Sequence, residues 1–242
     1  MTGVQTCVLP ISPKWIKPII IISIPWAISI HTVTAFLYSG LAARPFWMSA
    51  IMAPRFLATA FAAGPALLIV ICLFLRKTTK FDVGSNPIQK LAIIATYAML
   101  LNIFFLLLEL FTALYSGIYH HAEHFKFLYF GLDGNYTLVP FMWISAVLAI
   151  ISIILLIVPK FRKNEKLLLY AALSVFFSIW LDKGLGMVVA GFTPTPLGYV
   201  SAYWPTLTEF MISIGVFAVG IFVISGLYKI ALSVRRQLRE NI

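Results

Sequence analysis

Long apolar runs alternate with short polar segments along the whole chain. Six apolar runs are long enough to cross a hydrocarbon core of ~30 Å, which needs roughly 20 apolar residues per helix. Turn-forming and charged stretches such as GSNP, VPKFRKNEK and GFTPTPLG separate them. The pattern predicts an all-α, polytopic membrane bundle of six transmembrane helices, at about 16–40, 51–76, 88–118, 137–158, 166–191 and 206–233.

The composition supports a membrane protein and argues against a soluble one. The chain has 242 residues, of which 61% are hydrophobic and 11% are charged, and its mean hydropathy is +0.97. A soluble domain carries about 25% charged residues. The net charge of +10 comes from 18 Lys and Arg residues, but no basic stripe lies on a polar fold. We therefore expect membrane lipid, and no nucleic acid, around this chain.

The basic residues predict how the helices cross the membrane. Fourteen of the 18 lie at the start of the first predicted span or before it, around 76–90, around 160–166, or at the end of the last span or beyond it. These positions fall on one side of a six-helix topology. The positive-inside rule then places both termini in the cytoplasm and the loops 120–136 and 192–205 outside.

Six ionisable residues fall within or at the ends of the predicted spans. A helix rises ~1.5 Å per residue, so Asp182 lies ~24 Å from the inner end of the fifth span. All six belong to the outer half of the membrane by this reckoning. Charged groups are costly there, which favours a functional role over the alternative of ion pairs that only fix helix packing. The candidates are His31, Arg55, Glu109, Asp182, Lys183 and Glu209.

Neutral polar residues extend two of these positions into stripes. Ser174, Ser178 and Asp182 are spaced i, i+4, i+8, and Asn102 precedes Glu109 by seven residues, so each set shares one helix face. Hydroxyl and amide groups on one face can carry protons between carboxylates, with helix packing as the alternative role. We predict a proton-path stripe of Asn102, Ser174 and Ser178.

No set of metal ligands is evident in the sequence. Cys7 and Cys72 are too few for an iron–sulfur cluster or a cysteine-based zinc site, and no C-x-x-C-H occurs. The HHAEH run at 120–124 is interpreted as a loop with chance histidines, and His31 is the only histidine deep in a span. We expect no metal, haem or cluster on this chain. Any electron-carrying metal centre would belong to a partner.

The runs HTVTAF (31–36), DKGLGM (182–187) and YFGLDGNYTLVPFMW (129–143) resemble the NrfD/PsrC family of membrane quinone-interacting subunits, the polysulfide reductase family. The resemblance is greatest to its DsrP-like branch. It implies electron exchange between a menaquinone or ubiquinone pool and a ferredoxin-like iron–sulfur subunit. That subunit would connect to cytochrome and heterodisulfide-reductase-like subunits in sulfite or sulfur metabolism, at a bacterial inner membrane.

The resemblance also implies how the candidate residues divide. Family members have about ten spans, so these six would correspond to the C-terminal part, and most of the N-terminal bundle that contributes to the quinone pocket would be missing. His31 is then the best remaining quinone candidate. Glu109, Asp182 and Lys183 fall in the second bundle, where a proton path is expected. The subunit would not be catalytic alone, and no catalytic residue is assigned.

The first residues do not fit this interpretation. TGVQTCVLPI can be back-translated as a sequencing-library adapter, with one base differing at Val8. We therefore expect residues 1–12 to be a non-native tail on a fragment, and 13–242 to form the membrane domain.

Two other functions are compatible with the same residues. A transporter or ion-translocating subunit without redox chemistry would also place polar groups and kinked helices inside the membrane. A plain membrane anchor would leave the shared depth of the six ionisable groups unexplained.

Overall fold

The computed structural model describes residues 13–240, apart from 80–81, 118, 196 and 201–204. The tail predicted at 1–12 lies outside the described residues. The chain divides into two compact units, Met1–Ser201 and Ala202–Ile242, and each is described by itself. Within the described residues the regular structure is helical, and an isolated antiparallel bridge joins Leu132 to Asn135.

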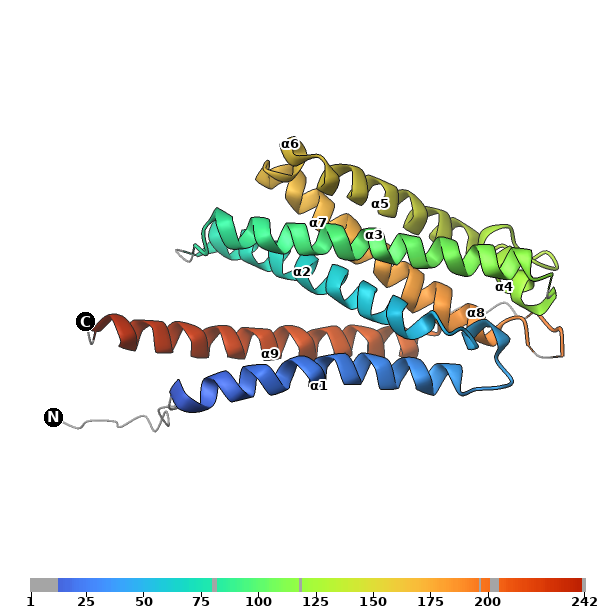
Figure 1. Ribbon diagram of the computed structural model, residues 1–242, viewed down its shortest axis with the longest axis horizontal. Helices are drawn as coiled ribbons and strands as arrows, with labels where there is room; N and C mark the ends of the chain where they lie inside the picture. Colours follow the sequence, from blue (N-terminus) through green and yellow to red (C-terminus); the bar gives the residue numbers. More distant parts are fainter. Residues whose placement is uncertain (1–12, 80–81, 118, 196, 201–204, 241–242) are drawn as a thin grey trace. The chain divides into compact units, whose positions relative to one another are not determined.

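The described residues of the first unit form ten helical elements (Figure 1). In chain order they are α1 (Pro13–Ser39), η1 (Pro45–Trp47), α2 (Met52–Thr78), α3 (Ser85–Tyr115), α4 (Tyr119–Tyr129), α5 (Val139–Ile157), α6 (Pro159–Arg162), α7 (Glu165–Trp180), η2 (Leu181–Met187) and α8 (Val188–Phe192). The short η1 is a 3₁₀-helix, whereas η2 is a π-helix continuous with α7 and α8.

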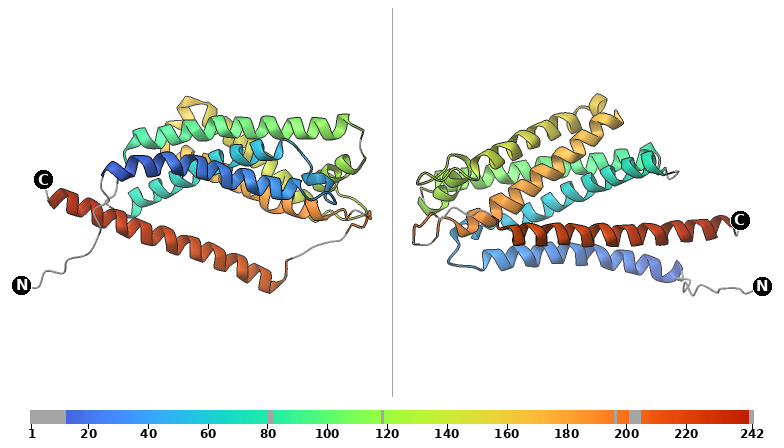
Figure 2. Two further views of the ribbon diagram at one scale, coloured as in Figure 1. Left: turned by 60° about the horizontal axis from the view of Figure 1, so that its bottom comes forward. Right: turned by 180° about the vertical axis from the view of Figure 1, so that it is seen from behind.

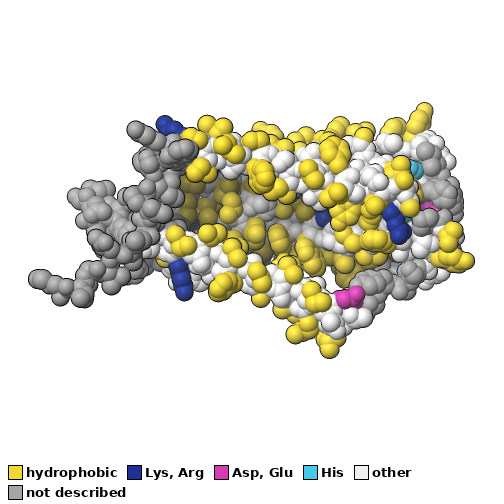
Figure 3. Space-filling model, turned by 90° about the horizontal axis from the view of Figure 1, so that it is seen from below, with side chains coloured by type: hydrophobic (Ala, Val, Ile, Leu, Met, Phe, Trp, Pro, Cys, Tyr) yellow, Lys and Arg dark blue, Asp and Glu magenta, His cyan; other side chains and the backbone are white. Residues whose placement is uncertain are grey.

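Six helical stretches in the described part of the chain are long and apolar enough to cross a membrane, which confirms the predicted spans. They are Lys17–Ser39, Met52–Thr78, Ser85–Tyr115, Val139–Ile157, Glu165–Phe192 and Leu207–Ile230. Apolar side chains cover much of the face drawn in Figure 3, as expected where lipid tails replace water. The orientation of the termini stays a prediction.

Small residues let the central helices of the first unit approach closely. Figures 1 and 2 show α2, α3, α5 and α7 running side by side. Their contacts contain alanines that are at most 1% exposed: Ala62, Ala66, Ala92, Ala95, Ala171 and Ala172. Between membrane helices there is little hydrophobic driving force, so close backbone approach and dispersion contacts supply the attraction.

An ion-pair network ties together one end of this bundle, which we call the basic end. The basic end comprises the last turn of α2, the first turn of α3, and α6. Arg76 on α2 pairs with Asp82 before α3, at 2.7 Å, and with Glu165 at the start of α7. The side chain of Asn164 caps α7 by accepting a hydrogen bond from the backbone N–H of Lys166 at 3.0 Å. The basic loops of the sequence therefore lie at one end of the bundle.

The opposite end, which we call the loop end, contains η1, α4 and α8. Trp47 of η1 is 1% exposed, and its Nε1 donates to the backbone carbonyl of Met187 at 2.9 Å. Gly191 of α8 lies so close to the Trp47 ring that a Cβ there would overlap it. The loop between α1 and α2 is thereby fixed against the end of the fifth span.

The second unit is a single described helix, α9 (Leu207–Glu240). The Glu209 carboxylate accepts hydrogen bonds from the backbone N–H of Thr206, at 2.7 Å, and from its hydroxyl, at 2.9 Å. Thr206 and Glu209 have the spacing of a capping box, which satisfies backbone donors at a helix start.

Candidate functional site

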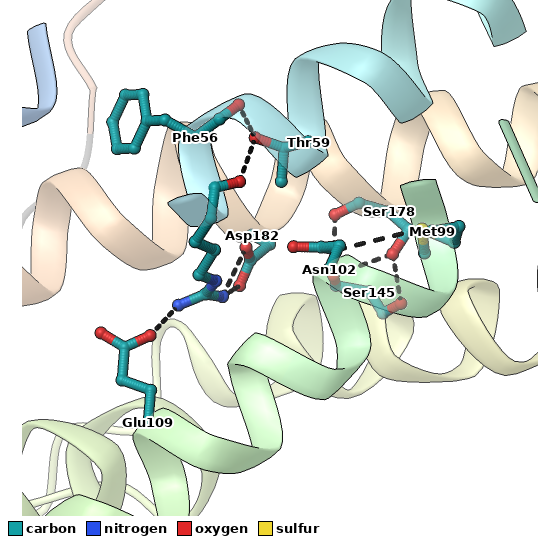
Figure 4. A network of polar contacts seen from close by, with 9 residues as sticks. Phe56, Thr59, Met99, Asn102, Glu109, Ser145, Ser178 and Asp182 are labelled. Atoms are coloured by element: carbon teal, nitrogen blue, oxygen red, sulfur yellow. Dashed lines mark hydrogen bonds and ion pairs between the residues drawn. The ribbon is translucent and has the colours of Figure 1, made fainter. Parts of the chain in front are cut away.

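One arginine joins three helical elements near the loop end. Arg55 lies in the first turns of α2, and its guanidinium donates to both carboxylate oxygens of Asp182, at 2.9 and 2.8 Å. It also pairs with Glu109 of α3. Figure 4 shows the two carboxylates, from α3 and from the fifth span, converging on this guanidinium. Three of the six predicted site residues therefore meet in one cluster.

The cluster is largely shielded from the surroundings. The side chains of Arg55, Glu109 and Asp182 are 8%, 11% and 14% exposed. Desolvating three charges is unfavourable, and the charges persist here because each is paired with hydrogen-bond geometry. The Nε atom of Arg55 is buried and has no recorded partner among the described residues. The Nε–H of Arg55 is therefore a buried hydrogen-bond donor that the two ion pairs do not use.

A local change of helix type positions Asp182 and its neighbour. The LDKGLGM segment forms the π-helix η2, whose wider turn is often found at functional sites. Gly186 belongs to this segment, and a Cβ at that position would lie 2.9 Å from Sδ and Cε of Met142 on α5. The glycine therefore allows α5 to pack against the wider turn.

Lys183 follows Asp182 but does not join the Arg55 ion pairs. Its Nζ lies 5.0 Å from the centre of the Phe56 ring, within the range of a cation–π contact. The same Phe56 ring also lines a groove beside α1. Lys183 is thus a fourth charged group of this region, on its groove-facing side.

The predicted polar stripe is partly assembled. Ser178 of α7 and Ser145 of α5 exchange hydrogen bonds: each hydroxyl donates to the other's backbone carbonyl, at 2.9 and 2.8 Å. Asn102 is 5% exposed, and its Oδ1 has no recorded partner among the described residues. No hydrogen bond from Ser174 to this stripe is recorded within the described part of the chain. A proton path through Asn102, Ser174 and Ser178 stays a prediction.

His31 lies apart from the ion cluster, between α1 and α2. Its ring contributes to two adjoining grooves of about 420 and 360 Å³. The larger groove is mostly apolar and runs past Gly64 and Pro65 of α2, and the smaller reaches Phe56 and Thr59. His31 Nδ1 is 2.9 Å from the backbone carbonyl of Ala27. A carbonyl only accepts, so Nδ1 carries the proton and Nε2 is the basic nitrogen.

Sequence reasoning missed several residues of this region because they carry no charge. Ser145, Phe56 and Thr59 belong to it, and Thr59 donates to the backbone carbonyls of Arg55 and Phe56. Tyr129 of α4 is another: burial, followed by the charge of Asp182, raises its pKa to about 12. Polar positions inside a span signal Ser145 and Thr59, but nothing in the sequence marks Phe56. Glu209, in the second unit, caps α9.

The described residues contain no group of three or more His, Cys, Asp or Glu side chains arranged to hold a metal ion. The expectation that haem and iron–sulfur clusters reside on partners stays a prediction.

The fold and the cluster define a class: a multi-pass membrane protein with a buried arginine–carboxylate network beside an apolar groove. Comparison with protein families shows the family of this chain. The family described as "Polysulphide reductase, NrfD" matches residues 1–193, and the chain belongs to this family. The resemblance in the sequence motifs is confirmed.

Three curated relatives show the range of complexes to which similar chains belong. The chain is 26% identical over 223 residues to a selenate reductase subunit of Mesobacillus selenatarsenatis, covering 88% of this chain and 51% of the relative. It is 23% identical over 226 residues to a putative dimethyl sulfoxide reductase membrane subunit of Halobacterium salinarum (84% and 50%). It is 24% identical over 233 residues to the Hdr-like menaquinol oxidoreductase integral membrane subunit of Archaeoglobus fulgidus (90% and 58%). The chain spans about half the length of these relatives.

Proposed function

We propose that this chain is part of a membrane subunit that exchanges electrons between a menaquinone or ubiquinone pool and an iron–sulfur partner subunit. Membership of the NrfD family supports this, as does similarity to a menaquinol oxidoreductase membrane subunit. Further redox subunits, of cytochrome and heterodisulfide-reductase-like types, would complete the complex in a bacterial inner membrane. A DsrP-like role in sulfite or sulfur metabolism is the finer form of the proposal.

The observation that carries the proposal is the placement of His31 in the groove between α1 and α2. A quinone needs an apolar channel for its tail and a titratable group near its ring, because its redox chemistry takes up and releases protons. The groove is lined chiefly by apolar residues, and the basic Nε2 of His31 can accept a proton from a quinol hydroxyl.

The ion cluster supplies the second part of the proposal, a route for those protons. Phe56 lines the groove beside His31 and contacts Lys183, which is adjacent in sequence to Asp182 of the cluster. Arg55 then connects Asp182 to Glu109. We infer that these residues take up the protons released at the groove and pass them on, and that Arg55 positions the carboxylates of Asp182 and Glu109.

The test is a substitution that keeps size and polarity but abolishes titration. His31→Gln in the full-length protein, assembled with its partners, should lower the rate of quinol oxidation by about 100-fold, the order expected for loss of a general base. Thr32→Val is the matched control, since Thr32 is the next residue on α1 and its hydroxyl donates to the backbone carbonyl of Ile28 in the same helix. Unchanged quinol oxidation in His31→Gln would show that the assignment is wrong.

A transporter without redox chemistry is the competing function. It predicts solute or ion flux by the chain without redox partners and without quinone. A neighbouring reading frame that encodes a cluster-rich ferredoxin-like protein would favour the redox subunit, whereas isolation from redox genes would favour the transporter.

A further inference from the structure

A small pocket at the loop end, separate from the His31 groove, reaches the ion cluster at Glu109. It has a volume of about 230 Å³ and lies between the segment from η1 to the start of α2 (46–51), the end of α3, and α4. Glu109 is part of its wall, together with Ser49, Thr112, Ser116 and His121. The pocket therefore reaches one member of the buried cluster from the end of the bundle where the loops lie.

The polar side chains on the wall of this pocket are suited to water rather than to a quinone ring. Both this pocket and the groove at His31 are lined chiefly by apolar residues, which in this pocket include Phe46, Met48 and Phe125. This pocket adds three hydroxyls, an imidazole and a carboxylate, whereas the groove at His31 has fewer polar side chains. A site holds water when it has room for it and offers each molecule two to four polar partners. The volume meets the first condition, and Glu109 with the hydroxyls of Thr112 and Ser116 meets the second along one wall of the pocket.

The helix geometry aligns the polar groups along the pocket. Glu109, Thr112 and Ser116 of α3 are spaced i, i+3, i+7, so they share one face of the helix. Thr112 and Ser116 are exposed, whereas the Glu109 side chain is 11% exposed. The lining thus leads from an exposed mouth to a nearly buried carboxylate.

The two oxygens of Glu109 have different surroundings. Oε2 accepts the hydrogen bond from Arg55, while no partner is recorded for Oε1 among the described residues. We propose that this pocket is a water-filled port through which Glu109 exchanges protons with the aqueous phase at the loop end. His121 also borders the port; it belongs to the HHAEH run, which lies in helix α4 and not in the loop expected from the sequence.

The exchange is a simple proton transfer. A protonated Glu109 gives its proton to a water molecule in the port, which becomes hydronium and leaves, and the resulting carboxylate pairs with Arg55. The reverse step takes a proton from hydronium and loosens that pair. The source of the protons at the groove depends on the proposed quinol chemistry, but the port does not.

Cysteine accessibility tests the port. In the full-length complex, with Cys72 replaced by serine, Thr112→Cys places a thiol in the port. Phe111→Cys is the matched control, because Phe111 precedes Thr112, is 59% exposed and is not part of the pocket lining. A membrane-impermeant trimethylammonium methanethiosulfonate should label Thr112→Cys at least about tenfold faster than Phe111→Cys. The thiol of Phe111→Cys would lie in an apolar setting, which raises its pKa, so that it forms less of the reactive thiolate.

Labelling at Thr112→Cys should also block proton exchange through the port. The attached cation at Thr112→Cys should lower quinol oxidation several-fold relative to the same variant before labelling, whereas labelling should leave the rate of the Phe111→Cys protein unchanged. Equal labelling rates at the two positions, or full activity after labelling of Thr112→Cys, would overturn the port. Fast labelling combined with normal quinol oxidation in His31→Gln would retain an accessible pocket but refute the proposed quinone site, so the two failures are distinguishable.

Discussion

Removing the Arg55 guanidinium is the most direct test of the buried cluster. Arg55→Met keeps a long unbranched side chain and deletes the charge that binds Glu109 and Asp182. Two carboxylates would then remain at 11% and 14% exposure without their cation. The variant therefore isolates the ion pairing from the packing of α2.

The expected loss of stability is large for a single substitution. Breaking a buried ion pair by removing one partner costs about 3–5 kcal/mol, because the other partner is left as an uncompensated charge. For a chain of 150–250 residues each kcal/mol shifts Tm by about 2–4 °C, so the drop should be roughly 6–20 °C. A longer full-length protein would show a smaller shift for the same free energy.

Thermal unfolding in detergent, with Lys90→Met as the control, measures this drop. Lys90 is an exposed basic residue of α3, so its loss should change Tm little. Adding Glu109→Gln and Asp182→Asn to Arg55→Met should recover much of the lost Tm, because the uncompensated charges are then gone. If Arg55→Met is no less stable than Lys90→Met, or if the triple variant is worse than the single one, the cluster does not hold the helices as described.

Two further predictions concern the ends of the bundle. Gly191→Ala should lower stability by about 1–3 kcal/mol because its Cβ would overlap the rigid, buried Trp47 ring. Gly184→Ala is the control, because no atom lies within 4 Å of a Cβ at that position. Equal Tm values for the two variants would contradict this packing. At the basic end, the backbone N–H of Gly84, followed by Arg76, lowers the pKa of Asp82 below its usual 3.8. The stabilisation by Asp82 is thus present above pH 3.8 and lost as the pH falls through the lowered folded-state pKa. A stability difference between Asp82→Asn and the parent that persists below that range would argue against it.

The spans could be predicted from the sequence because the membrane imposes one simple requirement. Backbone polar groups must be satisfied within each segment, and about 20 apolar residues must cover the hydrocarbon core. The predicted span at 137–158 and the observed Val139–Ile157 differ by only one or two residues at each end. Helix type was not predictable in this way, since nothing in the apolar pattern of 166–191 distinguishes the π-helix η2 from the α-helix around it.

The common depth of the charged residues in the membrane could be predicted from the sequence, whereas the ion pairs between them could not. Rise per residue places Arg55, Glu109 and Asp182 at a common height, whereas their meeting depends on how each helix is rotated about its axis. Lys183 illustrates the limit: it is adjacent to Asp182 in the chain, yet it contacts the Phe56 ring instead of joining the Arg55 ion pairs. His31 shares the depth and lies in a groove of its own, because α1 packs against a different face of α2.

The charge of the buried region constrains how protons can pass through it. Arg55 and Lys183 carry two positive charges, and Glu109 and Asp182 carry two negative charges, so the set is neutral as a whole. A proton that enters from the groove makes it positive, and an uncompensated charge in a region of low dielectric is costly. On the proposed path, release of a proton from Glu109 into the port would restore neutrality. Uptake on the His31 side and release at the loop end would therefore be coupled one for one, without any requirement that Arg55 itself lose a proton.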